Sequence, residues 1–270
     1  MNYKMIAMDL DDTLTTSEKV ISPKTYARLM EAQEKGMIIV LASGRTVIGM
    51  SKLADELKLD KYGGYVLAFN GARIINWRTK EEVYTLPVPS GSLSAIFDLC
   101  EEHKMPLLTH ENDHLVVEEP ENPYIIAEAK INQMPIQKID SFRSYIDFPV
   151  YKFIAVGDGD YLATKEPILR EALAPACDVY RSTPYFMEIV ASGIDKGEGL
   201  KRLAGICNIP MSEVVACGDG YNDIGMIRAA GLGVAMKNAL PDVRAAADYI
   251  TASNDEDGIA LLFDEKISLT

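Results

Sequence analysis

The sequence predicts an α/β fold with a smaller domain inserted into it, and two observations lead to this prediction. In the first and last thirds of the chain, short apolar runs alternate with amphipathic helical stretches, the pattern of a mostly parallel sheet that helices cover on both faces. The middle third is punctuated by prolines and orders its runs differently, which favours a compact α+β unit. We therefore expect a doubly wound, Rossmann-like core at residues 1–82 and 187–270 and an α+β domain at 83–186.

The core segments contain strands and helices whose ends carry recognisable signals. The first apolar run, Lys4–Met8, is expected to be a strand, and Ser22 with Pro23 begins a helix that Gly36 ends. The same alternation predicts, in order, a strand at 4–8, a helix at 23–34, a strand at 37–42, a helix from 46, a strand at 65–68, a helix from 196, a strand at 214–217, a helix from 222, a strand at 232–235 and a closing helix near 255.

The inserted domain contains two stretches that imitate functional motifs. HENDH, His110–His114, formally matches the HExxH zinc motif, which needs both histidines on one helical face. Because β-like runs flank it, we interpret it as a hairpin turn, and we interpret GDGD, Gly157–Asp160, as a turn with Asp160 as the N-cap of a helix. The expected elements of this domain are a strand from about 82, a helix at 90–103, the two strands flanking HENDH, a helix at 124–131, a strand at 151–156, a helix at 160–173 and strands near 178–181 and 186–190.

Composition and charge limit the classes of partner. The chain has 270 residues, 48% of them hydrophobic, so it can bury a sizeable core. Its net charge of −13 repels nucleic acids and anionic membrane surfaces, so neither is an expected partner. The four cysteines form no CxxC pair, and the longest apolar runs are too short to span a bilayer. We therefore expect a protein of the reducing cytoplasm, whose oligomeric state the sequence leaves open.

The stretch MDLDDTL, Met8–Leu14, places three aspartates directly behind the first apolar strand. Functional groups of parallel α/β sheets gather beyond the carboxyl ends of the strands, which is where this stretch is expected to lie. Asp9 and Asp11 are two positions apart, so both carboxylates can point to one side, where their repulsion favours a bound cation. Mg²⁺ is the natural partner; taken alone, the stretch is also consistent with an acidic turn that caps a helix.

Two further features offer groups for binding phosphate. LASGR, Leu41–Arg45, follows the second strand and supplies the Ser43 hydroxyl, the Gly44 backbone and the Arg45 guanidinium, which suit phosphate oxygens. Lys196 stands beside glycines at the start of a helix, where it could neutralise a phosphate. The alternative for LASGR is a turn at a helix start, and the alternative for the lysine is a solvated surface group.

CGDGYND, Cys217–Asp223, follows another apolar strand and adds the carboxylates of Asp219 and Asp223, with Asn222 beside them. Hard oxygen ligands of this kind suit Mg²⁺. The alternative is a turn followed by a helix N-cap. SNDEDG, near Asp255, is also acidic, and we interpret it as a solvated helix start.

In order and context, DxDxT, S with GR, K and GDxxND resemble the haloacid dehalogenase superfamily of aspartate-based phosphotransferases. More closely, the chain is similar to the Cof-type sugar phosphatases, with further similar stretches at 69–72, 234–251 and 253–260. The long stretch between Ser43 and Lys196 has room for the C2-type cap domain of this subfamily, whereas the short stretch from Asp9 to Ser43 has none for the alternative cap. One departure is Lys237, where family members often have glycine.

The resemblance implies a role for each motif residue. Asp9 would be the nucleophile that forms an aspartyl-phosphate, and Asp11 would protonate the leaving alcohol and deprotonate the attacking water. Mg²⁺ would be held by Asp9, the backbone carbonyl of Asp11 and Asp219, with Asp223 as a direct or water-mediated ligand. The other predicted site residues are Ser43, Gly44 and Lys196 for the phosphoryl oxygens, and Thr13, Arg45, Asn70, Gly71 and Asn222 for support of the substrate or the loops.

These roles imply a Mg²⁺-dependent phosphatase that hydrolyses small phosphate monoesters, such as sugar phosphates, through an aspartyl-phosphate. Its partner would be a small phosphorylated metabolite, which the cap would admit by opening. A sugar phosphomutase is a close chemical variant, and a non-catalytic phosphometabolite-binding or phospho-switch protein is an alternative of another class. Asp11 separates the classes, because receiving a phosphoryl group needs only Asp9, metal and Lys196, whereas rapid turnover also needs an acid and a base.

Overall fold

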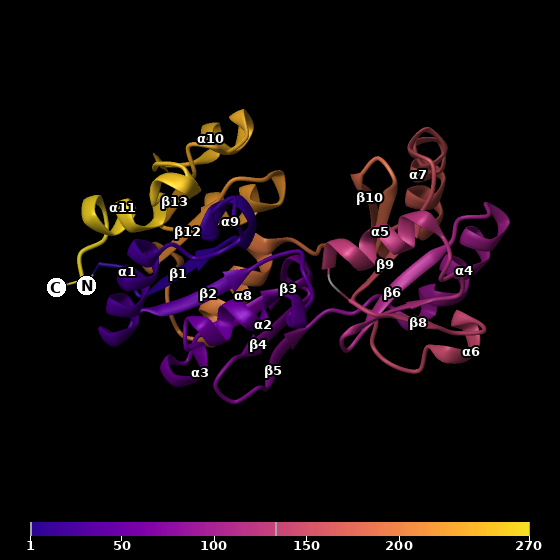
Figure 1. Cartoon of the computed structure of the whole chain (residues 1–270), viewed down its shortest axis with the longest axis horizontal. Helices are drawn as coiled ribbons and strands as arrows, with labels where there is room; N and C mark the ends of the chain where they lie inside the picture. Colours follow the sequence, from indigo (N-terminus) through magenta and orange to yellow (C-terminus); the bar gives the residue numbers. More distant parts are fainter. Residues whose placement is uncertain (1, 133, 270) are drawn as a thin grey trace. The chain divides into compact units, whose positions relative to one another are not determined.

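The computed structural model describes residues 2–132 and 134–269, and the chain divides into two compact units (Figure 1). Unit 1 comprises the residues up to Thr85 together with those from Asp195 onward. Unit 2 comprises Leu86–Ile194. Each unit has its own sheet.

The junctions between the units, at 85/86 and 194/195, lie three and eight residues beyond the expected ones. The expected junction at 82/83 falls inside strand β5 (Glu82–Thr85), and the one at 186/187 falls inside strand β11 (Phe186–Ala191). β5 pairs within the sheet of unit 1 and β11 within the sheet of unit 2. Strand pairing therefore assigns each strand as a whole to one unit, and the strand expected to open the inserted domain belongs to the core.

The sheet of unit 1 has eight strands in the order β14-β13-β12-β1-β2-β3-β4-β5. The strands from β14 to β3 are parallel, and β4 and β5 are added antiparallel at one edge. All four side chains of β1 are fully buried, so helices and loops cover both faces at the sheet centre. The predicted doubly wound, mostly parallel α/β core is confirmed. The strands of this sheet besides β5 are β1 (Met5–Met8), β2 (Ile38–Ala42), β3 (Tyr65–Ala68), β4 (Arg73–Asn76), β12 (Val214–Gly218), β13 (Leu232–Ala235) and β14 (Tyr249–Ile250).

The helices of unit 1 begin and end at residues that the sequence marks. In α1 (Pro23–Glu34), the Ser22 hydroxyl accepts a hydrogen bond from the Thr25 N–H at 3.1 Å, and Gly36 beyond its end has a φ of +89°, a conformation that favours glycine. α1 packs against α11, and α8 packs against α9. The helices after α1 are α2 (Val47–Glu56), α3 (Leu59–Tyr62), α8 (Lys196–Ile206), α9 (Ile224–Ala229), α10 (Pro241–Ala246) and α11 (Gly258–Glu265).

Unit 2 contains a six-stranded sheet in the order β10-β11-β9-β6-β7-β8, antiparallel except for the parallel pair β7 and β8. Its strands besides β11 are β6 (Leu107–Glu111), β7 (His114–Val117), β8 (Ile136–Lys138), β9 (Lys152–Val156) and β10 (Cys177–Thr183). Its helices are α4 (Leu93–Glu102), α5 (Pro123–Asn132), α6 (Phe142–Tyr145) and α7 (Gly159–Leu173).

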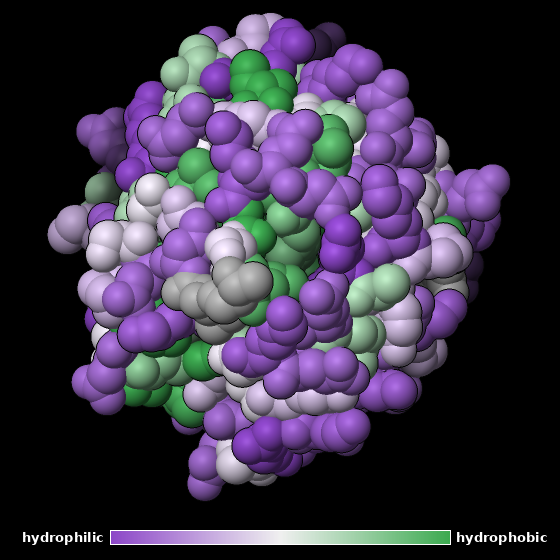
Figure 2. Space-filling view, turned by 90° about the vertical axis from the view of Figure 1, so that its left-hand side faces the viewer, coloured by the Kyte–Doolittle hydropathy of each residue, from purple (hydrophilic) through white to green (hydrophobic). Residues whose placement is uncertain are grey.

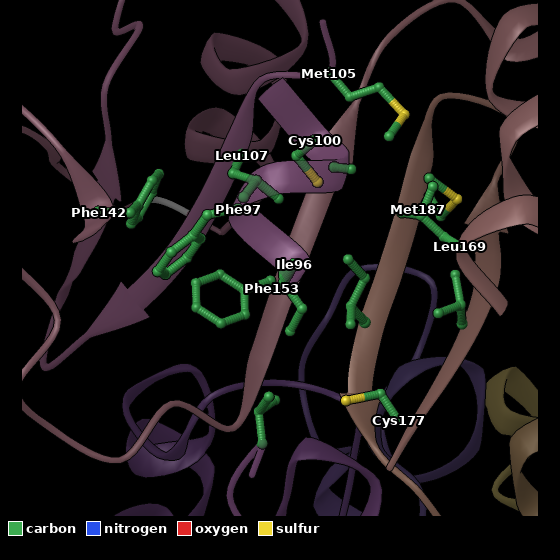
Figure 3. Packing of buried hydrophobic residues seen from close by; sticks show 14 of the residues in the cluster. Ile96, Phe97, Cys100, Met105, Leu107, Phe142, Phe153, Leu169, Cys177 and Met187 are labelled. Atoms are coloured by element: carbon green, nitrogen blue, oxygen red, sulfur yellow. The ribbon is translucent and has the colours of Figure 1, made fainter. Parts of the chain in front are cut away.

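The sheet of unit 2 is covered on both faces by apolar clusters. Phe153 on β9 belongs to a cluster in which its ring meets those of Phe97 and Phe142 edge-on, with centroid distances of 5.7 and 6.0 Å (Figure 3). The next residue, Ile154, points to the opposite face and joins a second cluster with Ile125 of α5. Unit 1 has a separate cluster that includes Met5 and Ala7 of β1, so each unit has a hydrophobic core of its own.

The two motif-like stretches of the inserted domain, HENDH and GDGD, lie at the ends of strands and helices of unit 2. HENDH joins β6 to β7, with Glu111 opposite His114, so the predicted hairpin turn is confirmed. The prediction of Asp160 as the N-cap of the following helix is wrong. Asp158 caps α7 and accepts from the N–H groups of Asp160 and Tyr161, because the helix begins one residue earlier, at Gly159.

One face of the protein surface is mainly polar. Figure 2 shows this face, on which hydrophilic residues predominate and hydrophobic ones are visible between them. This agrees with the 25% of charged residues in the sequence. Among the helices of the described residues, none combines the length and the apolar character needed to cross a bilayer.

Candidate active site

Three neighbouring parallel strands carry predicted site residues beyond their carboxyl ends. Asp9 follows β1, Ser43 follows β2 and Asp219 follows β12. The strand order β12-β1-β2 places these ends side by side, at the edge of a parallel sheet where functional groups gather. The chain after β1 forms a short turn, η1 (Leu10–Leu14), and the Asp9 N–H donates to the Cys217 carbonyl at 3.0 Å.

Lys196 is the buried cation of this site. It is fully buried at the first position of α8, where Asp195 caps the helix. Its Nζ lies 2.6 Å from Asp9 Oδ1 and 2.6 Å from Asp223 Oδ1. Burial by itself lowers the pKa of Lys196, but the two carboxylates outweigh burial and raise this pKa. The charged lysine therefore joins the loop after β1 to the loop after β12.

Three carboxylates gather near this single lysine. Oxygens of Asp9, Asp219 and Asp223 lie within 4.8 Å of one another. Burial raises the pKa of Asp9 to about 7, an effect that Lys196 opposes and Asp223 reinforces, and burial also raises the pKa of Asp219 to about 6. The cluster disfavours its own ionised form, so it fits a divalent cation with oxygen ligands, such as Mg²⁺.

Hydrogen bonds fix the two carboxylates of the loop after β12. Asp223 Oδ2 accepts from the N–H groups of Asp219 and Gly220, both at 2.9 Å. Thr13 Oγ1 donates to Asp219 Oδ1 at 2.6 Å, which ties this loop to η1. A Cβ at Gly218 would lie 2.3 Å from the Cβ of Asp223, so only glycine allows this close approach.

The Asp11 carboxylate is not one of the clustered three and pairs with two cations instead. Arg45 donates from Nε to Asp11 Oδ2 at 2.8 Å and from Nη2 to Oδ1 at 2.6 Å, and Lys19 Nζ lies 3.1 Å from Oδ1. Burial raises the pKa of Asp11, but Arg45 and Lys19 together lower it. The sequence analysis expected the carboxylates of Asp9 and Asp11 to point to one side, whereas in the structure they have different partners, Lys196 for Asp9 and Arg45 with Lys19 for Asp11.

The remaining predicted residues lie in loops that hydrogen bonds join. The Asn70 N–H donates to the Ser43 carbonyl at 2.9 Å, and Asn222 Nδ2 donates to Asn70 Oδ1 at 3.1 Å. A Cβ at Gly44 would lie 3.2 Å from Asn70 Oδ1. Gly71 has a φ of +100°, which explains glycine at that position. The loops after β2, β3 and β12 are thus connected through Asn70.

Two residues that hold η1 were missed by the sequence analysis. Lys19 contacts Asp11 and also lies 3.3 Å from Asp12 Oδ1. Asn238 Nδ2 donates to the Asp12 carbonyl at 2.7 Å, across 226 positions of the sequence. Lys19 stands in a polar stretch without a motif, and no local signal marks Asn238 as a partner of this loop.

A parallel α/β core with aspartates and a buried lysine beyond its strand ends defines a class of enzymes that handle phosphoryl groups through carboxylates. Comparisons with known proteins agree. Residues 6–263 match the family model of haloacid dehalogenase-like hydrolases. The chain is 34% identical to YxeH of Bacillus subtilis over 96% of both proteins. It is 30% identical to the 5-amino-6-(5-phospho-D-ribitylamino)uracil phosphatase YcsE of the same organism, over 96% of this chain and 94% of YcsE.

A solved structure agrees as well. The crystal structure of a haloacid dehalogenase-like hydrolase from Bacteroides thetaiotaomicron matches with a TM-score of 0.92 and 42% identity, covering 98% of this chain and 100% of that one. The chain therefore belongs to the haloacid dehalogenase-like hydrolase family. The resemblance found in its motifs is confirmed, and so is the prediction of an enzyme of the phosphoric monoester hydrolase class.

Proposed function

We propose that this protein is a Mg²⁺-dependent phosphatase that hydrolyses small phosphate monoesters, such as sugar phosphates, through an aspartyl-phosphate on Asp9. The observation that carries the proposal is the 2.6 Å contact between the buried Lys196 Nζ and Asp9 Oδ1, beside the carboxylates of Asp219 and Asp223. A carboxylate nucleophile held next to a fixed cation and a set of oxygen ligands suits phosphoryl transfer, in which charge spreads over the phosphoryl oxygens.

Mg²⁺ would be held by Asp9, the backbone carbonyl of Asp11 and Asp219, and when bound it would neutralise charge on the transferring phosphoryl group. Both oxygens of Asp223 already accept hydrogen bonds from the protein, one from Lys196 and the other from two backbone N–H groups. This supports a role for Asp223 in orienting Lys196 and the Asp219 loop, with any contact to the metal made through water.

The reaction would proceed in two displacements at phosphorus. First, the Asp9 carboxylate attacks phosphorus, the bond to the leaving alcohol breaks, and Asp11 gives that alcohol a proton. Then water attacks phosphorus, Asp11 accepts the proton of the water, and the bond to Asp9 breaks, which releases inorganic phosphate. The pair with Arg45 favours the ionised Asp11 of the second displacement, so proton donation in the first requires this pair to loosen. Lys196 with Ser43 and Gly44 would bind the phosphoryl oxygens.

We also propose that the enzyme acts in the cytoplasm on a small phosphorylated metabolite. All four cysteines are free, as is usual in a reducing compartment. The name of YcsE gives a phosphorylated ribitylamino compound as the substrate of that relative, which supports an ester of a sugar-like alcohol for this chain.

Replacing Asp9 with asparagine should abolish hydrolysis, because a neutral amide cannot take the place of the attacking carboxylate. The measurement is release of inorganic phosphate from a panel of sugar phosphates, nucleotides and phosphorylated cofactors, with Mg²⁺ and with EDTA. We expect release by the unmodified protein with Mg²⁺, no release with EDTA, and a rate lower by several orders of magnitude for Asp9→Asn.

Asp12→Asn provides a matched control within the same loop. Asp12 has a side chain that is 56% exposed and a φ of +59°, a conformation that asparagine tolerates well. We therefore expect the Asp12→Asn protein to keep its turnover. Undiminished hydrolysis by Asp9→Asn would rule out Asp9 as the nucleophile, and return of the phosphoryl group to a second sugar would indicate a mutase.

A further inference from the structure

The segment Met236–Leu240, between β13 and α10, connects the two acidic loops of the site. On one side its backbone joins the loop after β12: the Met236 N–H donates to the Gly218 carbonyl at 3.1 Å, and the Leu240 N–H donates to the Asp219 carbonyl at 3.1 Å. On the other side the Asn238 side chain reaches η1. We call this segment the brace.

Asn238 contacts η1 at Asp12, the residue of this turn with an unfavourable backbone conformation. Asp12 adopts a left-handed conformation, with φ 59° and ψ 10°, which is uncommon for residues other than glycine and persists when surrounding contacts hold it. Asn238 Nδ2 donates to the Asp12 carbonyl at 2.7 Å. Asp12 is the residue directly after Asp11, and the backbone carbonyl of Asp11 is a proposed metal ligand. The contact therefore fixes the stretch of backbone that would face the metal.

Asn254 supports the brace from the turn before α11. Its N–H donates to Asn238 Oδ1 at 3.2 Å, which orients the Asn238 amide with its nitrogen toward η1. Its own Nδ2 donates to the Thr15 carbonyl at 3.0 Å, at the end of the same loop. The two asparagines thus hold η1 at the Asp12 carbonyl and at the Thr15 carbonyl, directly after its last residue.

We propose that Asn238 is a positioning residue for the divalent cation: through the brace it holds η1 at the distance from the Asp219 loop at which both loops can bind one ion. The proposal rests on the proposed Mg²⁺ site and adds a residue to it. Without the Asn238 amide, η1 would be held to the Asp219 loop chiefly by the Thr13 hydroxyl and by Lys196. Metal ligands that lose such supporting partners bind their ion more weakly.

The test compares Asn238→Ala with Lys237→Ala, the same truncation at the neighbouring position. Lys237 is 63% exposed and pairs with Glu256 on the surface, so its loss should change little. Mg²⁺ binding is measured by calorimetry on the full chain without substrate, and backbone mobility is measured by amide hydrogen exchange of the metal-free proteins. For Asn238→Ala we expect about tenfold weaker Mg²⁺ binding and faster exchange confined to residues 12–15.

Each other outcome would overturn the proposal. If the unmodified protein binds Mg²⁺ and Asn238→Ala binds it equally well, Asn238 does not position the cation site, whatever its effect on thermal stability. If Lys237→Ala weakens binding as much as Asn238→Ala, the effect does not come from the contact with Asp12. If the unmodified protein does not bind Mg²⁺ at all, the proposed metal site fails, and the role of Asn238 toward it fails with it.

Discussion

Lys196 shows how one side chain holds the site together. It is the hydrogen-bond donor to both Asp9 and Asp223, and the three side chains are 0%, 12% and 1% exposed. Charges removed from water in this way are stable only as a group, because breaking a buried pair leaves an uncompensated charge. The lysine therefore has a structural role in addition to its proposed contact with phosphate.

Replacing Lys196 with methionine should lower the free energy of unfolding by about 3–5 kcal/mol, because Asp9 and Asp223 would stay buried without their cation. The two side chains have similar lengths, so the loss of packing is small. The measurement is urea denaturation in EDTA. Lys201→Met is the control on the same helix, because Lys201 is 50% exposed and pairs with the exposed Glu198; it should unfold like the unmodified protein. Coinciding transitions for the two variants would contradict a structural role for Lys196.

Residues within one motif could be predicted from the sequence, whereas their partners could not. The carboxylates of GDxxND stand in one loop, so their spacing indicates a shared site, and Asp219 and Asp223 do lie in one cluster. Lys196 and Asp9 are 187 positions apart, and their contact depends on the strand order of the folded sheet. The pair of Asp11 with Arg45 depends in the same way on β1 lying beside β2, which no local pattern expresses.

At the scale of elements, two of the three glycines of α8, Gly197 and Gly205, have opposite surroundings. A Cβ at Gly197 would lie 2.4 Å from the carbonyl carbon of Gly225, at the contact between α8 and α9. A Cβ at Gly205 would meet no atom within 4 Å. The first glycine is required by close packing, while the second only adds flexibility to the unfolded chain.

Gly197→Ala and Gly205→Ala should therefore change stability in opposite directions. We expect Gly197→Ala to lower the free energy of unfolding by about 1–3 kcal/mol, because the methyl group must push α8 from α9. We expect Gly205→Ala to raise it by about 0.5–1 kcal/mol, since alanine restricts the unfolded chain and suits a helix. Thermal unfolding of the two variants measures both effects. Destabilisation by Gly205→Ala, or tolerance of Gly197→Ala, would show that this account of the helix contact is wrong.

Elements with strong local signals were predicted well, and those that depend on pairing were not. The N-cap Ser22 and the following Gly36 delimit α1 as expected. β5 shows no apolar run, with its four residues exposed or half-buried; its pairing with β4 and the packing of Val83 and Tyr84 against the core of unit 1 assign it to the core sheet. β14 has two residues, too few for any periodic pattern to indicate a strand.

For the whole chain, the separation into two units determines which part of the structure a bound ligand stabilises. Every predicted site residue, from Asp9 to Asp223, belongs to unit 1. Unit 2 has a separate sheet and the apolar cluster around Phe153. A ligand that binds only the native form of one unit stabilises that unit by mass action, and the second unit gains only if the two unfold together.

Mg²⁺ should therefore slow amide hydrogen exchange in β1 and β12 of unit 1 and leave β6 and β9 of unit 2 unchanged. At a concentration 100 times the dissociation constant, the expected stabilisation is about 2.7 kcal/mol, which corresponds to roughly 100-fold slower exchange where global opening of unit 1 limits it. Mass spectrometry of peptides from the four strands measures the effect. Asp219→Asn, which removes a proposed ligand and keeps the size of the side chain, should abolish the protection.

The pattern of protection tests two separate points: whether unit 1 opens independently of unit 2, and whether the proposed residues bind Mg²⁺. Protection confined to β1 and β12 means that unit 1 opens independently, so the cation stabilises the structure that holds its ligands and no other. Equal protection of β9 would contradict independent opening while leaving the metal site intact, because only a shared opening transfers stabilisation to a sheet without ligands. Protection that survives in Asp219→Asn would contradict the site itself, since Mg²⁺ would then be bound elsewhere.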